Sequence, residues 1–190
     1  MQTSTGAKQA FEIKKADIGF LIHRDNWMSR TIAWFMRSRW SHAFLIKHVT
    51  DEDVYTLETS DFEVTIGMLQ LYVDDPNVEL EIWSPKNIDD EERKRIVIES
   101  EKTYGTVYGY LQLVSFGIRC ILKRFNIHIK NFIRQGMVCD HVVLYGYRIS
   151  SIAKLRGIDP ESIDSEELYQ LVKSSDDFEL RYLKTYEANR

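Results

Sequence analysis

Apolar residues in the first half of the chain fall into short runs of the kind found in strands. Runs at 17–22 and 42–48 are rich in β-branched and aromatic residues and predict two strands. Between them, apolar residues near helical spacing predict a short amphipathic helix that begins after Asp25 or Asn26. Three more strands are predicted at 53–58, 62–68 and 79–83, separated by turn-forming residues. The first half therefore predicts an antiparallel meander.

After Pro85 the pattern becomes that of helices. Residues 88–105 open with acidic side chains, which suit a helix N-terminus, and close with Gly105 at a plausible C-cap position. Further helices are predicted at about 107–124 and 138–151, and a short one begins near Asp164 or Ser165. Strands followed by helices predict an α+β fold in which an antiparallel sheet packs against helices.

Length and composition restrict the class of protein. A chain of 190 residues fits one domain, 1–190, with a core at about 15–150 and a C-terminal helical extension at 151–190. The net charge of −4 argues against nucleic acid as a partner, since binding the phosphate backbone requires clustered Lys and Arg. We found no secretory signal at the N-terminus, and the most apolar run, 111–122, is too short to span a bilayer. A cytoplasmic location is expected, and the sequence does not predict an oligomeric state.

Of the two cysteines, Cys139 is the candidate nucleophile. It follows a glycine-marked loop at the predicted start of a helix, where amide hydrogens and the helix dipole stabilise a thiolate. The alternative, a small buried apolar residue, is the more common role of an isolated cysteine. Cys120, in the middle of a predicted helix, is assigned to the core. His141, two residues after Cys139, points to another helix face and is expected to be structural or to support the site indirectly. Nothing like a CxxC metal pair is present, and covalent catalysis by a thiol needs neither a metal nor an organic cofactor, so none is expected.

His42 and Glu58 are the candidate partners of this thiol. His42 stands at the entrance to an apolar strand, a rigid mount for a general base, although a histidine bonded to the backbone is an equal alternative. Glu58 ends the next predicted strand, where antiparallel pairing would bring its carboxylate beside the imidazole. A solvated acid at a strand end is the alternative for Glu58, and Asp61 and Glu63 are nearby substitutes for its role.

Four segments, in this order, resemble the permuted papain-like peptidases of the NlpC type, YiiX-like proteins included. The first is 17–46, in which the pair Ser41-His42 opens the second predicted strand; the others are YTLE at 55–58, YGTVYGY at 104–110 and VCDHVV at 138–143. The last is also similar to a motif of the lecithin retinol acyltransferase relatives, which share the permuted fold. Residues 163–168 resemble the closing acidic helix of the family. Histidine before cysteine is the order that permutation produces.

The resemblance implies a circularly permuted papain-like fold with a catalytic triad of Cys139, His42 and Glu58. It implies a cysteine hydrolase that cleaves an amide bond through an acyl-enzyme, in a peptide or a peptidoglycan fragment. One alternative is a lipid acyltransferase or lipid-amide hydrolase, in which the helix at 27–39 would contact a membrane surface; a core-facing helix is favoured. Another is a catalytically silent binding or assembly protein of the same fold.

Two positions depart from the family pattern. Gly109 stands where an aspartate is usual, and Val138 stands where the acyltransferase relatives have asparagine before the cysteine. A basic and aromatic insertion at 123–134 also precedes the cysteine helix. We predict that this insertion covers the cleft as a lid.

Overall fold

The computed structural model describes residues 12–60, 63–107, 118, 122, 125 and 138–186. Within these residues, six strands form one sheet with the order β4-β3-β2-β1-β5-β6, and all neighbouring pairs are antiparallel. The strands are β1 (Ile18–His23), β2 (His42–Val49), β3 (Val54–Thr59), β4 (Val64–Met68), β5 (Val78–Pro85) and β6 (Phe178–Lys184). The predicted strands of the first half are therefore present, and they are neighbours in the sheet.

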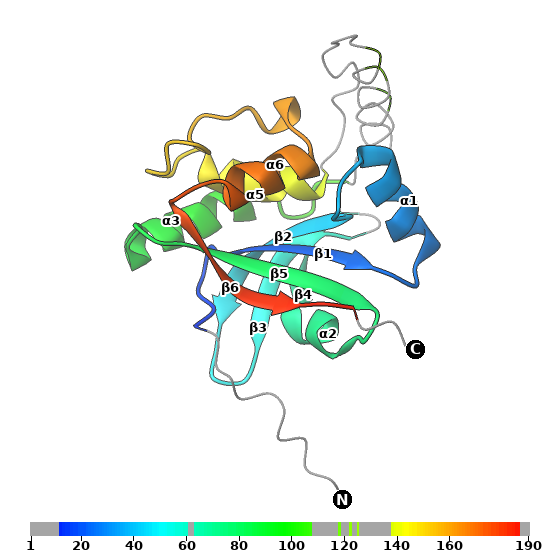
Figure 1. The fold of residues 1–190 in the computed structure, drawn as a ribbon. Coiled ribbons are helices and arrows are strands. Elements are labelled where there is room, and N and C mark those ends of the chain that lie inside the picture. Colours follow the sequence, from blue (N-terminus) through cyan, green and yellow to red (C-terminus); the bar gives the residue numbers. More distant parts are fainter. Residues whose placement is uncertain are drawn as a thin grey trace, which may run out of the picture.

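Helices pack on both faces of this sheet. They are α1 (Trp27–Met36), α2 (Leu69–Asp74), α3 (Asp90–Glu101), α5 (Cys139–Tyr147) and α6 (Ser165–Lys173), with a 3-10 turn, η1 (Pro160–Ser162). Figure 1 shows α3, α5 and α6 on one face of the sheet, α2 on the other, and α1 beside the sheet. The predicted α+β class is confirmed. In the part of the chain that is described, no helix is long and apolar enough to cross a membrane.

The central strands are buried on both faces. In β2, Ala43 and Leu45 belong to the core beneath α3, α5 and α6, whereas Phe44 and Ile46 belong to a second core on the side of α2. Successive side chains of a strand point to opposite faces, so a strand with two covered faces is apolar throughout. This accounts for the unbroken apolar run of β2.

Side-chain caps start three of the helices. Asn26 accepts hydrogen bonds from two amides of α1, as predicted, and Asp89 accepts one from the first turn of α3. Asp164 and Glu167 form a reciprocal capping box at the start of α6, close to the predicted start of that helix. Such caps satisfy amides that have no partner within the helix.

The C-terminal extension is not entirely helical, and this prediction was wrong for residues 178–184. After α6 the chain forms β6, which pairs with β5 through contacts such as Ser84 opposite Glu179 and Leu80 opposite Lys184. Phe178 is buried in the main core, and the strand covers the edge of β5. The segment therefore completes the sheet and is an integral part of the fold.

Two predicted helices end earlier than expected, and a short helix was missed. The helix assigned to 88–105 ends at Glu101, and Gly105 lies in the following turn with φ of 74°. The helix assigned to 138–151 ends at Tyr147. The missed helix is α2, which occupies the residues between the predicted strands at 62–68 and 79–83.

Several predictions fall outside the described residues. They concern most of the helix at 107–124, the start of the strand at 62–68, the lid at 123–134 apart from Phe125, and the residues Cys120, Gly109 and Asp61. Val107 is described and forms an isolated antiparallel bridge with Glu63.

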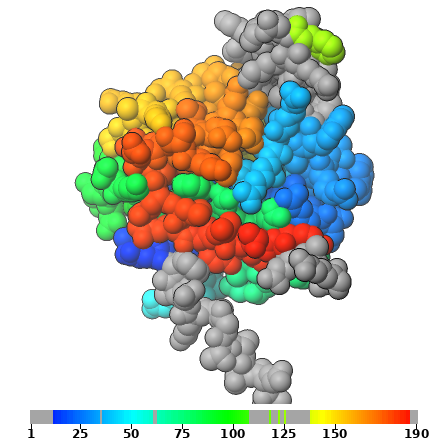
Figure 2. All heavy atoms as spheres, viewed as in Figure 1, coloured from blue at the N-terminus to red at the C-terminus, as the bar shows by residue number. Residues whose placement is uncertain are grey.

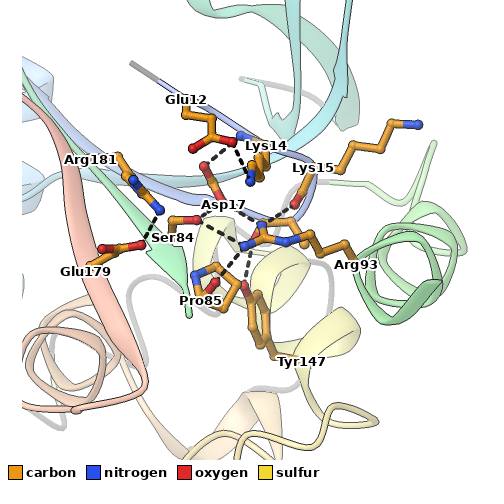
Figure 3. Close-up of polar contacts among 11 residues, drawn as sticks. Glu12, Lys14, Lys15, Asp17, Ser84, Pro85, Arg93, Tyr147, Glu179 and Arg181 are labelled. Carbon is orange, nitrogen blue, oxygen red and sulfur yellow. Dashed lines mark hydrogen bonds and ion pairs between the residues drawn. The ribbon is translucent and has the colours of Figure 1, made fainter. Parts of the chain in front are cut away.

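A buried ion pair joins α3 to the sheet (Figure 3). The Arg93 guanidinium donates to Asp17 Oδ1 at 2.8 Å, to Ser84 Oγ at 3.1 Å and to the Pro85 carbonyl at 2.6 Å. Asp17 is fully buried, and this burial raises its pKa, although hydrogen bonds from Ser84, the backbone and Arg93 oppose the rise. The network fixes α3 against the adjacent strands β1 and β5.

Candidate active site

The sheet and α5 bring Cys139, His42 and Glu58 to one place. His42 is the first residue of β2, and Glu58 is the penultimate residue of β3. Because β2 and β3 are antiparallel, with Leu45 opposite Leu57, the start of one lies beside the end of the other. Cys139 is the first residue of α5, which packs on the core that includes β2, so its thiol reaches this end of the sheet. All three predicted site residues are therefore neighbours.

The Glu58 carboxylate is fixed by three side chains. His42 Nε2 lies 2.7 Å from Glu58 Oε2, the Tyr72 hydroxyl donates to the same oxygen at 2.5 Å, and the Thr56 hydroxyl donates to Oε1 at 2.6 Å. Burial raises the pKa of Glu58, but these hydrogen bonds and the charge of His42 more than offset it, and the pKa lies below its ordinary value. The carboxylate is therefore ionised and held in one orientation.

Cys139 and His42 perturb each other's protonation. Burial raises the pKa of the Cys139 thiol, but the hydrogen bond and charge of His42, the Ala43 amide and the Ser165 hydroxyl bring it below its ordinary value. Burial lowers the pKa of His42, but hydrogen bonds and charges from Cys139 and Glu58 raise it to about 10. These shifts favour a thiolate beside an imidazolium. Since Nε2 is engaged by Glu58, the ring nitrogen left for sulfur is Nδ1.

Ser165 is a further contact of the sulfur. Its hydroxyl oxygen lies 3.7 Å from Cys139 Sγ, and both residues are buried. Ser165 is the first residue of α6, as Cys139 is of α5, so two helices begin beside this sulfur. Amides at a helix start carry partial positive charge, which favours the thiolate.

A cleft of about 560 Å³ opens beside the imidazole and the Glu58 carboxylate. Its walls come from β1, α1, the ends of β2 and β3, β4 and α2. The residues along it include Leu21, Trp27, Met28, Ile32, Thr65, Gly67 and Tyr72. The surface is mostly apolar, with the polar groups of His42 and Glu58 at one place, as is common in small-molecule sites. The Cys139 residue retains only 7% of its exposure.

The Glu58 carboxylate occupies space that is available because Gly67 has no side chain. Gly67 lies in β4 opposite Thr56, and a Cβ atom at this position would stand 1.8 Å from Glu58 Oε1 and 2.6 Å from Thr56 Oγ1. Such distances are far below van der Waals contact. A side chain at position 67 would therefore displace the carboxylate from the imidazole.

The remaining candidates do not join this cluster. Glu63 is exposed and takes part in the bridge with Val107, and Asp61 lies outside the described residues. His141 is 2% exposed, and burial lowers its pKa to about 4, although the charge of Asp159 opposes this shift. It is buried in α5, and its structural or supporting role stays a prediction.

Sequence reasoning missed Thr56, Tyr72, Gly67 and Ser165. Thr56 had a local signal, because it lies two residues before Glu58 and so faces the same side of the strand. Tyr72 belongs to the missed helix α2, and Gly67 acts through the cross-strand register. Ser165 is 26 residues from Cys139, and only the tertiary fold brings them together.

Comparison with known proteins shows the fold alone. The sequence matches no family model and no curated protein. The crystal structure of YiiX from Escherichia coli O157:H7, described as a metalloprotein, is similar with a TM-score of 0.57, and 12% of residues are identical. The match covers 90% of this chain and 97% of that chain, so the protein has a YiiX-like fold over nearly its full length. Within the described residues here, no group of three or more His, Cys, Asp or Glu side chains is placed to hold a metal ion.

Proposed function

We propose that this protein is a cysteine hydrolase that cleaves an amide bond, built on a circularly permuted papain-like fold of the NlpC type. The observation that carries the proposal is the arrangement of three side chains. The Cys139 thiol, at the start of α5, interacts with the His42 ring, and the His42 ring is bonded to the Glu58 carboxylate. A nucleophile, a base and a group that orients the base are the parts of a catalytic triad.

In the first step, the Cys139 thiolate attacks the carbonyl carbon of the substrate. A carbon–sulfur bond forms, and the carbonyl π electrons move to oxygen, which becomes an oxyanion. Amides at the start of α5, such as that of Cys139, have no partner within the helix and are suited to donate to this oxyanion.

In the next steps, His42 moves the protons. The imidazolium donates a proton to the amide nitrogen, the carbon–nitrogen bond breaks, and a thioester remains on Cys139. Water then attacks the thioester, His42 accepts its proton, and the carboxylic acid product leaves as the thiolate re-forms. Glu58 holds the ring orientation and stabilises the imidazolium throughout.

We propose a peptide as the substrate class, with a cell-wall peptide as the family analogue. The same acyl-enzyme would serve a lipid acyltransferase if an acceptor other than water resolved the thioester. The apolar walls of the cleft suit an apolar side chain or acyl group beside the scissile amide. Incubation with peptide and lipid-amide libraries, followed by mass spectrometry of the products, distinguishes hydrolysis from transfer.

The thiolate is tested without knowledge of the substrate. We expect iodoacetamide to alkylate Cys139 at pH 6 at least about tenfold faster in the native protein than in the denatured chain, because an ordinary thiol is protonated at that pH. Mass spectrometry of the Cys139 peptide separates this site from Cys120. His42→Ala should abolish the advantage, whereas His48→Ala, an exposed position on the same strand, should retain it.

Two outcomes would count against the proposal. Equal alkylation rates in the native and denatured chain would show that the thiol is not activated. A reactive thiolate that turns over no member of either library would instead favour the catalytically silent binding protein.

A further inference from the structure

The outer face of α1 carries two exposed tryptophans. Trp27 and Trp34 retain 74% and 76% of their exposure, and Met28 beside them retains 44%. Positions 27 and 34 are seven residues apart, so both lie on one face of the helix. Figure 2 shows α1, in blue, at the outside of the molecule. The helix was expected to turn its apolar residues to the core, but its two largest side chains point to solvent.

The inner face of α1 fixes the helix to the protein. Ala33 and Met36 are buried, and the Ser29 hydroxyl lies 2.5 Å from that of Ser41 and accepts a hydrogen bond from the His23 amide at 3.1 Å. These contacts attach α1 to the protein through its inner face. Large exposed apolar side chains gathered on the opposite face commonly mark an interaction surface.

Basic residues border the tryptophans. Arg24 and Arg39 are engaged by acidic groups, at 2.6 Å from Glu79 and 3.1 Å from Glu81 respectively. Arg30 lies in α1, three residues after Trp27, and Arg37 is the left-handed residue that ends the helix; both are exposed. Asp25 is the acidic residue just before the helix. This basic border contrasts with the net charge of −4 for the whole chain.

We infer that α1 docks on an anionic lipid surface. Tryptophan places an apolar ring system and an N–H donor at a membrane interface, and neighbouring arginines are attracted by anionic headgroups. The combination of exposed tryptophan rings with exposed arginines is complementary to such a surface in both polarity and charge. Trp27 also lines the cleft that contains His42 and Glu58, so docking would place the mouth of the cleft at the lipid headgroups.

This docking does not require the chemistry of Cys139, so each proposal is tested independently. We would use the full chain with Cys139→Ser and sediment it with vesicles of phosphatidylcholine alone or mixed with phosphatidylserine. We expect binding to the mixed vesicles, weaker binding to the neutral ones, and loss at high salt. Vesicles with brominated acyl chains should quench the tryptophan fluorescence.

Matched variants assign the binding to α1. Trp27→Ala with Trp34→Ala, and separately Arg30→Glu with Arg37→Glu, should each weaken binding to the mixed vesicles by about tenfold or more. Leu71→Ala and Arg156→Glu alter an exposed apolar side chain on α2 and an exposed basic side chain after α5, and should leave binding unchanged. Circular dichroism verifies that each variant is folded.

Absence of co-sedimentation at low salt would overturn the inference, and so would unchanged binding by the double tryptophan variant. Either result would leave a protein partner as the occupant of this face. Alkylation of Cys139 in the wild-type chain is measured separately, so loss of docking and loss of the activated thiolate are distinguishable.

Discussion

At the scale of single residues, the arrangement of the site depends on the space around the Glu58 carboxylate. Thr56, Tyr72 and His42 all bind that group, and the missing side chain of Gly67 makes room for it. Displacing the carboxylate would break some of these hydrogen bonds. Small changes beside it should therefore affect the His42 ring and, through the ring, the Cys139 thiolate.

Gly67→Ala should displace Glu58 while leaving every titratable group in the chain. The new methyl group would collide with Oε1, and the His42 ring would lose its fixed partner. We expect the alkylation rate of Cys139 at pH 6 to fall by roughly tenfold to a hundredfold, since small misplacements in such sites have effects of that order. Ile66→Ala, an exposed neighbour in β4, is the control and should retain the wild-type rate. A wild-type rate in Gly67→Ala would show that Glu58 does not support the thiolate.

Ser165→Ala should raise the pKa of Cys139. With sulfur as a thiolate, the Ser165 hydroxyl donates to it, and removing this donor disfavours the charged form. We expect the midpoint of the alkylation profile to move to higher pH by roughly half a unit, from a single neutral hydrogen bond. Ser162→Ala removes a hydroxyl that donates to the Asp159 carbonyl and should leave the midpoint unchanged. A midpoint unchanged in Ser165→Ala would assign the lowered pKa to the other groups.

The three site residues were predictable because each has a local signal. Cys139 follows a glycine-marked loop, His42 starts an apolar strand and Glu58 ends the next strand, and the family resemblance linked them. The structure places them together, and their catalytic role stays a prediction. Tyr72 and Ser165 were not predictable, because no periodicity or spacing relates them to Glu58 or Cys139 along the chain.

At the scale of elements, the strands with clear apolar runs were predictable from the sequence. The strand β6 and the short helix α2 have weaker patterns and were missed. β6 alternates Phe178, Leu180 and Tyr182 with charged side chains, but it follows a helix in an acidic segment and was assigned to a helical extension. α2 spans only Leu69–Asp74, which is too short for helical periodicity to be visible. Its role is defined by tertiary packing, since Leu69 belongs to the second core.

Gly146 in α5 also has a tertiary explanation. A Cβ atom there would lie 2.3 Å from Ser100 Oγ and 2.6 Å from the Ile96 carbonyl, so α3 and α5 approach closely at this glycine. Glycine inside a helix is unfavourable by itself. Here it permits the approach, and Ser100 donates to the Val142 carbonyl at 2.8 Å across the same interface. This contact helps to hold α5, and with it Cys139, in position.

The attachment of α3 is tested by Arg93→Met. This change removes the cation but leaves Asp17 buried between β1, β5 and α3. Breaking a buried pair on one side typically costs about 3–5 kcal/mol, and we expect a loss of roughly 3 kcal/mol because protonation of Asp17 relieves part of the cost. Urea unfolding followed by tryptophan fluorescence measures it. Adding Asp17→Asn should recover part of the loss, and Lys94→Met, at an exposed position on α3, should have little effect.

At the scale of the whole molecule, the sheet connects the beginning and the end of the chain. β6 pairs with β5, β5 pairs with β1, and residues from 152 to 178 contribute to the same core as β1 and β2. The segment expected to extend the domain is therefore needed to close it. Such a fold should unfold as one unit, and a buried group in α5 should affect the stability of the whole chain.

His141 is such a group, and it should make the stability depend on pH. Its pKa in the folded protein is lowered to about 4 from an ordinary value of 6.5. Between these values the unfolded chain binds a proton that the folded chain does not, so the free energy of unfolding falls as the pH falls. The difference corresponds to at most about 3 kcal/mol between pH 6.5 and pH 4. Well above pH 6.5 His141 is neutral in both states and contributes no slope.

Urea unfolding of the wild type and of His141→Gln, measured at several pH values from 7.5 to 4, isolates this contribution. Carboxylates with a lowered pKa, such as Glu58, also contribute less to the free energy of unfolding as the pH falls. They are present in both proteins, so their contribution cancels in the difference between the two curves. The difference between the two stability curves should therefore be constant above about pH 7 and shift in favour of His141→Gln as the pH falls. His48→Gln, at an exposed position, should give a curve parallel to that of the wild type. Parallel curves for His141→Gln as well would mean that His141 has the same pKa in the folded and the unfolded protein. A charged His141 would then be tolerated in α5, two residues from Cys139.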